Sequence, residues 1–491
     1  RTEAGQPQRT EVLIIGAGMS GLAMGRQLKR AGVRDFIIAE RADGPGGVWR
    51  ANAYPGAACD VPSHLYSYSF FPNPDWSRKF APQAEIKAYF ERASAEFGLE
   101  PHTRYEKSVR ALTYQEAEGV WRVEFEDGEA LMARVVVSAV GQLSEPFSPV
   151  FEGRDQFKGQ IVHTAEWTPD IDMTGKRVAM IGSAASAIQV LPHAAKAAKT
   201  LSVFQRTPNW IIPKPDRAFT PVEKGLFRHA PGYHWLYRMG SFLLHELRWS
   251  AFRSGGLAAA YTRHRLTRRI KSQVEDKAVL EQVLPDYAPG CKRILLSNDF
   301  FETLNQTHVH LVTDGVQCFT PEGVMTAGGE VIEADLVILA TGFKATEFLP
   351  NLDVRGRGGR SLKAVWGESP TAYKGVALSG FPNLFTLYGP NTNLGHNSII
   401  FMIERQTEFV RRQTMRLLNA DAISLEVSEA AQNAFNARLQ KRLSDTVWAG
   451  ECPSWYKSPD GIIVSNWAGP ASRYALALSG RDTDAFVLET P

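Results

Sequence analysis

Two glycine-rich turns, each following a short apolar run, constrain the fold of this chain more than any other feature. The run Val12–Ile15 leads into Gly16–Gly21, and the run Val178–Ile181 leads into Gly182–Ala187. A strand that enters a helix through such a turn is typical of dinucleotide-binding βαβ units, in which the helix N-terminus faces a pyrophosphate. Two such units predict one site for a tightly held flavin and one for a nicotinamide that reduces it.

The first turn has the complete G-x-G-x-x-G spacing. Gly16 permits the tight turn, Gly18 lets the backbone approach a pyrophosphate, and Gly21 lets the helix pack against the strand. Glu40 follows the next strand, Phe36–Ala39, where a carboxylate can accept both ribose hydroxyls and would repel a 2′-phosphate. This turn therefore favours FAD or NAD over NADP. The alternative is a structural glycine turn in an unrelated α/β protein.

The second turn departs from that spacing because Ala184 stands at the middle position, and alone it is equally consistent with a structural turn. The strand that follows, Leu201–Phe204, ends in Gln205-Arg206-Thr207, so a cation stands where the first unit has an acid. A guanidinium can bind a 2′-phosphate through two parallel hydrogen bonds, which favours NADPH over NADH. A solvated arginine is the alternative. The predicted nicotinamide site comprises Gly182, Ser183, Ala184, Gln189, Arg206 and Thr207.

Two similar strand exits indicate how the domains are connected. Ser138-Ala-Val-Gly141 ends the apolar run 135–140, and Ala340-Thr-Gly-Phe343 ends the run 336–339. Interpreted as crossings between domains, they predict an α/β fold of two Rossmann-like domains with the second inserted in the first. The FAD-binding domain would comprise 11–140 and 340–491, and the NADPH-binding domain 141–339. Residues 1–10 are expected to form a disordered tail.

The α/β alternation stops between residues 221 and 287, where Leu, Trp, Tyr and Arg recur at helical spacing. This pattern predicts a helical insertion in the second domain, with its basic residues on a solvated face. Membrane contact through an amphipathic helix is the less favoured alternative.

Composition narrows the function classes. A net charge of +3 does not favour a nucleic-acid partner. The four cysteines stand singly, without metal-knuckle or CxxC spacing, so no metal site is expected and a reduced, cytoplasmic setting is favoured. We expect neither a signal peptide nor a membrane span, because the amino end is polar and no apolar run reaches the roughly 18 residues of a spanning helix.

Two longer signatures carry a family resemblance. The pattern FxGxxxHxxxW, normally followed by Pro or Asp, is met by Phe157, Gly159, His163 and Trp167, with Thr168 at the next position. The pattern [AG]GxWxxxx[FY]P[GM]xxxD is met in full by Gly46, Gly47, Trp49, Tyr54, Pro55, Gly56 and Asp60. With them, the chain from about residue 11 to its carboxyl end resembles the type I Baeyer–Villiger monooxygenases. These flavoproteins convert ketones to esters or lactones.

The resemblance implies FAD and NADPH as cofactors, and a ketone and O2 as substrates. It also implies that a C4a-peroxyflavin attacks the ketone. The segment Cys291-Lys292-Arg293 resembles the part of the family that carries its active-site arginine. Arg293 would then stabilise the anionic peroxide, Lys292 would contact the 2′-phosphate, and Asp60 would hold Arg293. A charged strand entry at 292–293 and an ordinary loop acid at Asp60 are the alternatives.

Further roles are implied in the same way. Gly47 and Trp49 would border the flavin, and Asn397 would contact its ring. His163 would act in a linker that orients the domains, rather than in proton transfer. Trp455 would lie on a mobile loop over the nicotinamide, although core packing is an equal alternative.

Two other functions remain alternatives. The first is an amine- or sulfide-oxidising flavin monooxygenase, which Trp167 and Asp60 argue against. The second is a non-catalytic flavin-binding redox sensor, which would need neither Arg293 nor a 2′-phosphate site.

Overall fold

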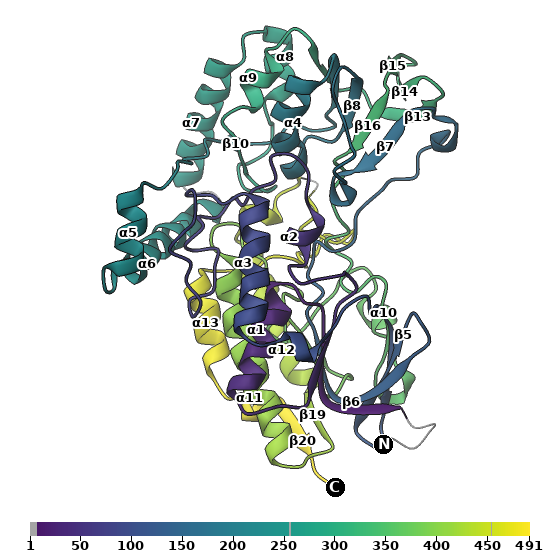
Figure 1. Cartoon of the computed structure of the whole chain (residues 1–491), viewed down its shortest axis with the longest axis vertical. Helices are drawn as coiled ribbons and strands as arrows, with labels where there is room; N and C mark the ends of the chain where they lie inside the picture. Colours follow the sequence, from purple (N-terminus) through teal and green to yellow (C-terminus); the bar gives the residue numbers. More distant parts are fainter. Residues whose placement is uncertain (1–6, 255–256, 453) are drawn as a thin grey trace.

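The computed structural model describes residues 7–254, 257–452 and 454–491. Two α/β lobes lie one above the other along the long axis, and the carboxyl end lies at the far end of the lower lobe (Figure 1). The lower lobe contains the first βαβ unit and the carboxyl-terminal third of the chain. The upper lobe contains the second βαβ unit.

The first βαβ unit forms the centre of the lower lobe. Strand β1 (Gln8–Ile15) leads into helix α1 (Met19–Arg30), and β2 (Phe36–Ala39) pairs in parallel with β1. The sheet order is β17-β4-β5-β6-β1-β2-β3, and β18 also pairs with β6. The remaining strands are β3 (Thr103–Arg104), β4 (Val109–Gln115), β5 (Val120–Phe125), β6 (Ala130–Ser138), β17 (Asp353–Arg355) and β18 (Leu384–Thr386).

The second βαβ unit belongs to a five-stranded parallel sheet of order β12-β9-β8-β16-β7. Its strands are β7 (Gln160–His163), β8 (Arg177–Ile181), β9 (Thr200–Phe204), β12 (Val309–Val312) and β16 (Leu336–Leu339). Helix α4 (Ala185–Ala197) follows β8 directly. The central strands β8 and β16 are buried almost throughout, as expected for a parallel sheet covered on both faces.

Helices and short strands complete both lobes. Lower-lobe helices are α2 (Val48–Ala51), α3 (Gln83–Glu96), α10 (Leu362–Trp366), α11 (Ile399–Asn419), α12 (Glu429–Leu443) and α13 (Ala471–Ser479), beside the pair β19 (Ser424–Val427) and β20 (Phe486–Glu489). The upper lobe adds α9 (Phe300–Leu304), the parallel pair β10 (Ile211–Ile212) and β11 (Leu295–Leu296), and an antiparallel sheet of β13 (Val316–Thr320), β14 (Gly323–Thr326) and β15 (Val331–Glu333).

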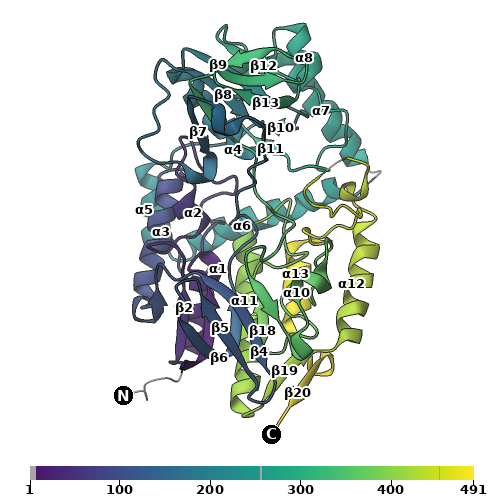
Figure 2. The ribbon, with the colours of Figure 1, turned by 90° about the vertical axis from the view of Figure 1, so that its right-hand side faces the viewer.

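The segment 221–287 is helical, in agreement with its residue pattern. It contains α5 (Pro221–His229), α6 (Tyr233–Leu247), α7 (Leu257–Gln273) and α8 (Lys277–Val283). Helix α6 runs between the two lobes (Figure 2). In the described part of the chain, no helix is long and apolar enough to cross a membrane.

The expectation of a disordered tail over residues 1–10 is wrong for its last three residues. Residues 8–10 belong to β1, where Gln8, Arg9 and Thr10 stand opposite Leu131, Met132 and Ala133 of β6. The polar composition of this stretch hid the strand, because the ladder uses backbone groups and Gln8 and Arg9 leave their side chains in solvent. Residues 1–6 lie outside the described residues.

Candidate active site

The first glycine turn leaves room for a nucleotide close to the backbone. Gly16 has φ +104°, and a Cβ there would lie 2.8 Å from the Ala139 carbonyl oxygen. A Cβ at Gly21 would overlap the Gly16 carbonyl, so only glycine lets α1 pack here. Gly18 is the N-cap of α1 and no side chain caps that helix, which leaves its first amides free for an anion.

Glu40 is buried and occupies the position predicted for the ribose-binding acid. Its Oε2 accepts a hydrogen bond from the Ala17 amide at 2.6 Å, and its Oε1 accepts one from the Ala42 amide at 2.8 Å. These bonds place the carboxylate beside the glycine turn. Gly47 approaches from the other side: it has φ +54°, and its added Cβ would lie 3.0 Å from Gly18 Cα. Trp49 follows, with Nε1 donating to the Tyr66 hydroxyl at 3.0 Å.

The second turn has the same construction. Gly182 has φ +115°, and a Cβ there would lie within contact distance of the Ala340 backbone. Ala184, the residue that departs from the motif, has φ −88° and is the N-cap of α4, again without a side-chain cap. Alanine adopts this φ without strain, which explains why the second turn tolerates it. Ser183 is buried, and its carbonyl oxygen accepts a hydrogen bond from Asn209 at 3.0 Å.

The two cations predicted to recognise the 2′-phosphate, Arg206 and Lys292, lie in the upper lobe with Thr207 of the predicted nicotinamide site. Lys292 Nζ donates to Thr207 Oγ1 at 2.8 Å. Burial, and secondly the charge of Arg206, lower the pKa of Lys292. Two cations held this close repel each other, so an anion between them would be stabilised. The fold therefore brings Lys292 to the end of β9, although 85 residues separate it from Thr207. The phosphate role of these residues stays a prediction.

The second signature holds the lobes together. The Tyr54 hydroxyl donates to Gln189 Oε1 at 2.9 Å, and Gln189 Nε2 donates to the Ala58 carbonyl at 3.0 Å. Gly56 has φ +80°, and a Cβ there would lie 2.8 Å from the His193 ring. These contacts fix the loop 54–60 against α4. Gln189 thus joins the two lobes, and its contact with a nucleotide stays a prediction.

That loop positions Asp60 on Arg293. Arg293 Nη2 donates to Asp60 Oδ2 at 2.9 Å, and the Asp60 side chain is only 9% exposed whereas that of Arg293 is 43% exposed. A guanidinium is protonated at every physiological pH. Burial raises the pKa of Tyr456 to about 12, with the charge of Arg293 acting in the opposite direction, so that phenol also lies close to the guanidinium. Asp60 therefore holds a permanently charged, partly exposed guanidinium where the two lobes meet.

The fingerprint residues lie around β7, on the edge of the second sheet. Phe157 packs against Phe319, and a Cβ at Gly159 would collide with the Phe157 ring. His163 ends β7 opposite Leu339, the residue before the 340–343 crossing. Its Nδ1 accepts from the Ala165 amide at 3.1 Å, and burial lowers its pKa. Trp167 is buried in the core of the upper lobe. These contacts agree with a linker role for His163, which stays a prediction.

Asn397 and Trp455, which were predicted to lie beside the cofactors, contact other parts of the protein. Asn397 Nδ2 donates to Glu246 Oε1 of α6 at 2.8 Å, and its Oδ1 accepts from the Ser398 amide at 2.8 Å, so both ends of the amide are engaged by protein. Trp455 is 37% exposed and lies against the buried Tyr456, with ring centroids 4.3 Å apart. Trp455 is therefore not a core residue. The flavin contact of Asn397 and the loop role of Trp455 stay predictions.

The interpretation of four single cysteines is wrong for two of them. Cys291 and Cys452 form a disulfide across 161 residues, while Cys59 and Cys318 are free. Metal-knuckle and CxxC motifs identify only cysteines that lie close together in the sequence. Cys291 and Cys452 instead pair where the segment before Arg293 meets the loop before Trp455. Single cysteines therefore no longer support a reduced setting. Among the described residues, no cluster of potential metal ligands occurs.

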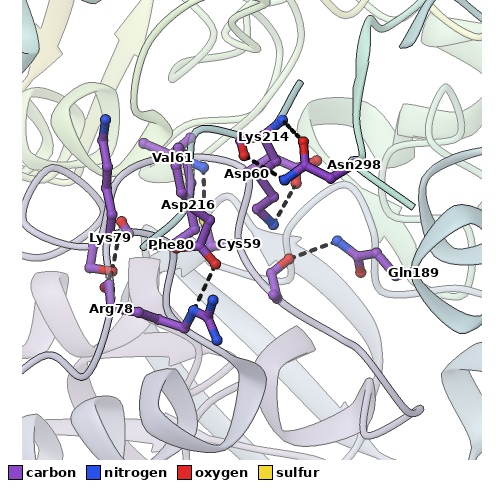
Figure 3. A network of polar contacts seen from close by, with 12 residues as sticks. Cys59, Asp60, Val61, Arg78, Lys79, Phe80, Gln189, Lys214, Asp216 and Asn298 are labelled. Carbon is purple, nitrogen blue, oxygen red and sulfur yellow. Dashed lines mark hydrogen bonds and ion pairs between the residues drawn. The ribbon is translucent and has the colours of Figure 1, made fainter. Parts of the chain in front are cut away.

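Sequence patterns also missed Lys214. Its Nζ lies 3.2 Å from Asp60 Oδ1 (Figure 3). No motif contains it, and the only signal was its position just after the short apolar run at 211–212.

Two glycine turns at helix N-termini, an acid beside the first and clustered cations beside the second define a two-dinucleotide oxidoreductase. Comparison with known proteins refines this class. A family described as "FMO-like: Flavin-binding monooxygenase-like" matches residues 9–232. A Baeyer–Villiger monooxygenase of Pseudomonas aeruginosa is 40% identical over 98% of this chain and 92% of its own length. A Baeyer–Villiger monooxygenase of Streptomyces coelicolor is 39% identical over 95% of this chain and 90% of its own length.

Solved structures agree. An oxidised steroid monooxygenase bound to NADP is 31% identical with a TM-score of 0.88, covering 99% of this chain and all of that one. OTEMO in complex with FAD and NADP is 28% identical with a TM-score of 0.88, covering 98% and 99%. The chain belongs to the Baeyer–Villiger monooxygenase family of flavin-binding monooxygenases. This confirms the family, the two-Rossmann α/β fold and the monooxygenase class predicted from the motifs.

Proposed function

We propose that this protein converts ketones to esters or lactones, with FAD as resident cofactor, NADPH as reductant and O2 as oxidant. The observation that carries the proposal is the ion pair of Asp60 and Arg293, which holds a permanent cation where the two nucleotide-binding lobes meet. The similar structures solved with NADP, and with FAD and NADP together, support the choice of cofactors.

The residues present fit FAD at the first turn. The uncapped start of α1 offers amides to a pyrophosphate, and Gly18 and Gly47 leave their shared space free of side chains. Glu40 offers a carboxylate to the ribose. When bound there, FAD would supply hydride acceptance and the activation of O2. The protein groups would bind it, orient it and set the charge around it.

The second turn fits NADPH. Arg206, Thr207 and Lys292 form a cluster with two cations, which suits a 2′-phosphate that NADH lacks. The domains implied by these two sites are 11–140 with 340–491 for FAD, and 141–339 for NADPH. These boundaries stay part of the proposal.

Arg293 supplies the electrostatic part of the reaction. Negative charge develops on oxygen when a nucleophilic oxidant adds to a ketone carbonyl, and a fixed cation stabilises that charge most where water is excluded. Asp60 is buried and bonded, so it keeps the guanidinium oriented before the substrate binds. The same cation would disfavour a neutral, electrophilic oxidant of the kind that attacks amines and sulfides.

The test is an assay of purified holoprotein with NADPH, O2 and a panel of cyclic, aliphatic and aromatic ketones, with products identified by mass spectrometry. Incorporation of one atom from ¹⁸O2 into an ester or lactone is the expected result. Oxidation of amines or sulfides with no ester from any ketone would instead assign the protein to the other branch of flavin monooxygenases. If no ketone accelerated the consumption of NADPH, the result would favour a non-catalytic flavin-binding protein.

A further inference from the structure

Asp60 has a second cationic partner besides Arg293. Lys214 Nζ lies 3.2 Å from Oδ1, while Arg293 Nη2 donates to Oδ2 at 2.9 Å, so each carboxylate oxygen contacts one cation. The side chains of Lys214 and Asp60 are 14% and 9% exposed. Ion pairs on open surfaces contribute little, but this one is shielded from solvent on both sides.

The backbone of Lys214 is held independently of this ion pair. Lys214 N donates to Asn298 Oδ1 at 3.1 Å, and Asn298 Nδ2 donates back to the Lys214 carbonyl at 2.8 Å (Figure 3). The parallel pairing of Ile211 with Leu295 brings this segment beside the one that carries Arg293. The backbone of Lys214 is therefore held in place while its side chain contacts Asp60.

The neighbouring acid does not compete for Lys214. Asp216 Oδ2 accepts from Arg78 at 2.6 Å, and its Oδ1 accepts from the Phe80 amide at 3.2 Å. Lys214 Nζ itself lies 5.4 Å from the centre of the Phe80 ring. Among the described residues, Asp60 is thus the carboxylate with which Lys214 forms an ion pair.

The charges at this point do not cancel. Asp60 and Arg293 alone sum to zero, whereas Asp60, Arg293 and Lys214 sum to one positive charge. A single carboxylate also cancels a smaller part of the positive potential of each cation when two cations share it. The excess charge would favour a bound anion over its neutral, protonated form.

We propose that Lys214 is a positioning residue for Arg293: it holds and partly neutralises Asp60, so that a net positive charge selects nucleophilic oxidation of ketones over electrophilic oxidation of sulfides. This rests on the proposed function of Arg293. Lys214 acts through Asp60 and is not assigned contact with the substrate.

The test compares Lys214→Met, Lys214→Arg and Lys79→Met in the holoenzyme. Lys79 is a suitable control, because it lies in the same region and, among the described residues, its side chain forms no ion pair with a carboxylate. For Lys214→Met we expect the ratio of ester to sulfoxide product to fall about tenfold, and the acidic limb of the ester pH profile to move up by about one pH unit. Lys214→Arg should keep the product ratio and the pH profile close to wild type, and Lys79→Met should leave both unchanged.

A readout independent of turnover is the midpoint potential of the bound flavin. Reduced flavin carries negative charge at neutral pH, so loss of the net positive charge of the Asp60, Arg293 and Lys214 cluster should make the potential of Lys214→Met more negative, with Lys214→Arg close to wild type. An unchanged product ratio together with an unchanged potential would overturn the proposal, and a lowered melting temperature alone would show that Lys214 only joins the lobes. An Arg293→Ala variant that still makes ester at the wild-type rate would instead overturn the proposed function itself.

Discussion

Asp60 and Arg293, which lie 233 residues apart in the sequence, are joined by a hydrogen bond of 2.9 Å from Nη2 to Oδ2. Asp60 ends a loop that Gln189 and Gly56 fix against α4 of the other lobe. The guanidinium is therefore oriented by a carboxylate that belongs to the lobe carrying the first glycine turn. A change in how the lobes dock would move both groups of the pair.

Arg293→Ala should separate the two halves of the reaction. Without the cation, oxygen transfer should fall by about 10² or more, the scale of losing one preorganised electrostatic group. Flavin reduction by NADPH should survive better, because the 2′-phosphate contacts remain. Stopped-flow reduction and ester yield from one preparation measure this. Arg268→Ala, at an exposed position of α7, is the control, and equal losses in both steps would contradict the assignment.

Arg206→Ala should weaken the binding of NADPH and leave the binding of NADH unchanged. Loss of a contact to the 2′-phosphate should raise the KM for NADPH by about ten- to a hundredfold, equivalent to roughly 1.4–2.8 kcal/mol. Steady-state kinetics with both cofactors provide the comparison, with NADH as the internal control. An equal rise in both KM values would remove Arg206 from the phosphate site.

Gly21→Ala should yield protein that retains little FAD. The added methyl would overlap the Gly16 carbonyl and push α1 away from β1. Wild-type protein should be yellow, with FAD released intact by heat; FMN, or colour that stays on the denatured chain, would contradict the prediction. Gly225→Ala in α5 is the matched control, because a Cβ there meets no atom within 4 Å.

Glu246 should contribute acid-sensitive stability. Burial alone would raise its pKa, but the contact with His396, 3.5 Å away, and hydrogen bonds from Ser472 and Asn397 outweigh that effect and lower the pKa to about 2. Against an unfolded value of 4.5, this contributes about 3 kcal/mol above pH 4.5, which is lost as the pH falls towards 2.

We therefore expect Glu246→Gln to lower the melting temperature at pH 7 and to flatten its decline between pH 5 and 3. Differential scanning calorimetry across this range measures both effects. Glu368→Gln, at an exposed position, should match wild type. Parallel pH curves for Glu246→Gln and wild type would show that the carboxylate adds no acid-sensitive stability.

Cys452→Ser should destabilise the native protein by about 2–5 kcal/mol, because the disulfide closes a loop of 161 residues and restricts the unfolded chain. Denaturant unfolding under non-reducing conditions measures the change, and a peptide map should contain the Cys291–Cys452 cross-link. Cys318→Ser is the control, since that thiol is free. Identical midpoints with and without dithiothreitol would contradict a stabilising cross-link.

Much of the fold was predictable from local patterns. The turns at Gly16 and Gly182 follow apolar strands and open helices within a few residues, so short-range spacing specifies them. The helical insertion was equally visible in its periodicity. The strand at 8–10 was not, because its pairing with β6 uses backbone groups that leave no pattern in the side chains.

The sequence by itself determined the two nucleotide turns and Arg206, the cation that follows β9, because each lies in a short motif whose geometry is local. Asp60 and Arg293 became candidates because their segments resemble those of a known family. Only the tertiary structure decided which of these groups meet. The Asp60–Lys214 contact, the Cys291–Cys452 disulfide and the Asn397–Glu246 bond each join segments more than 150 residues apart. Such contacts depend on how the lobes and α6 pack together, and side-chain spacing along one segment carries no information about that packing.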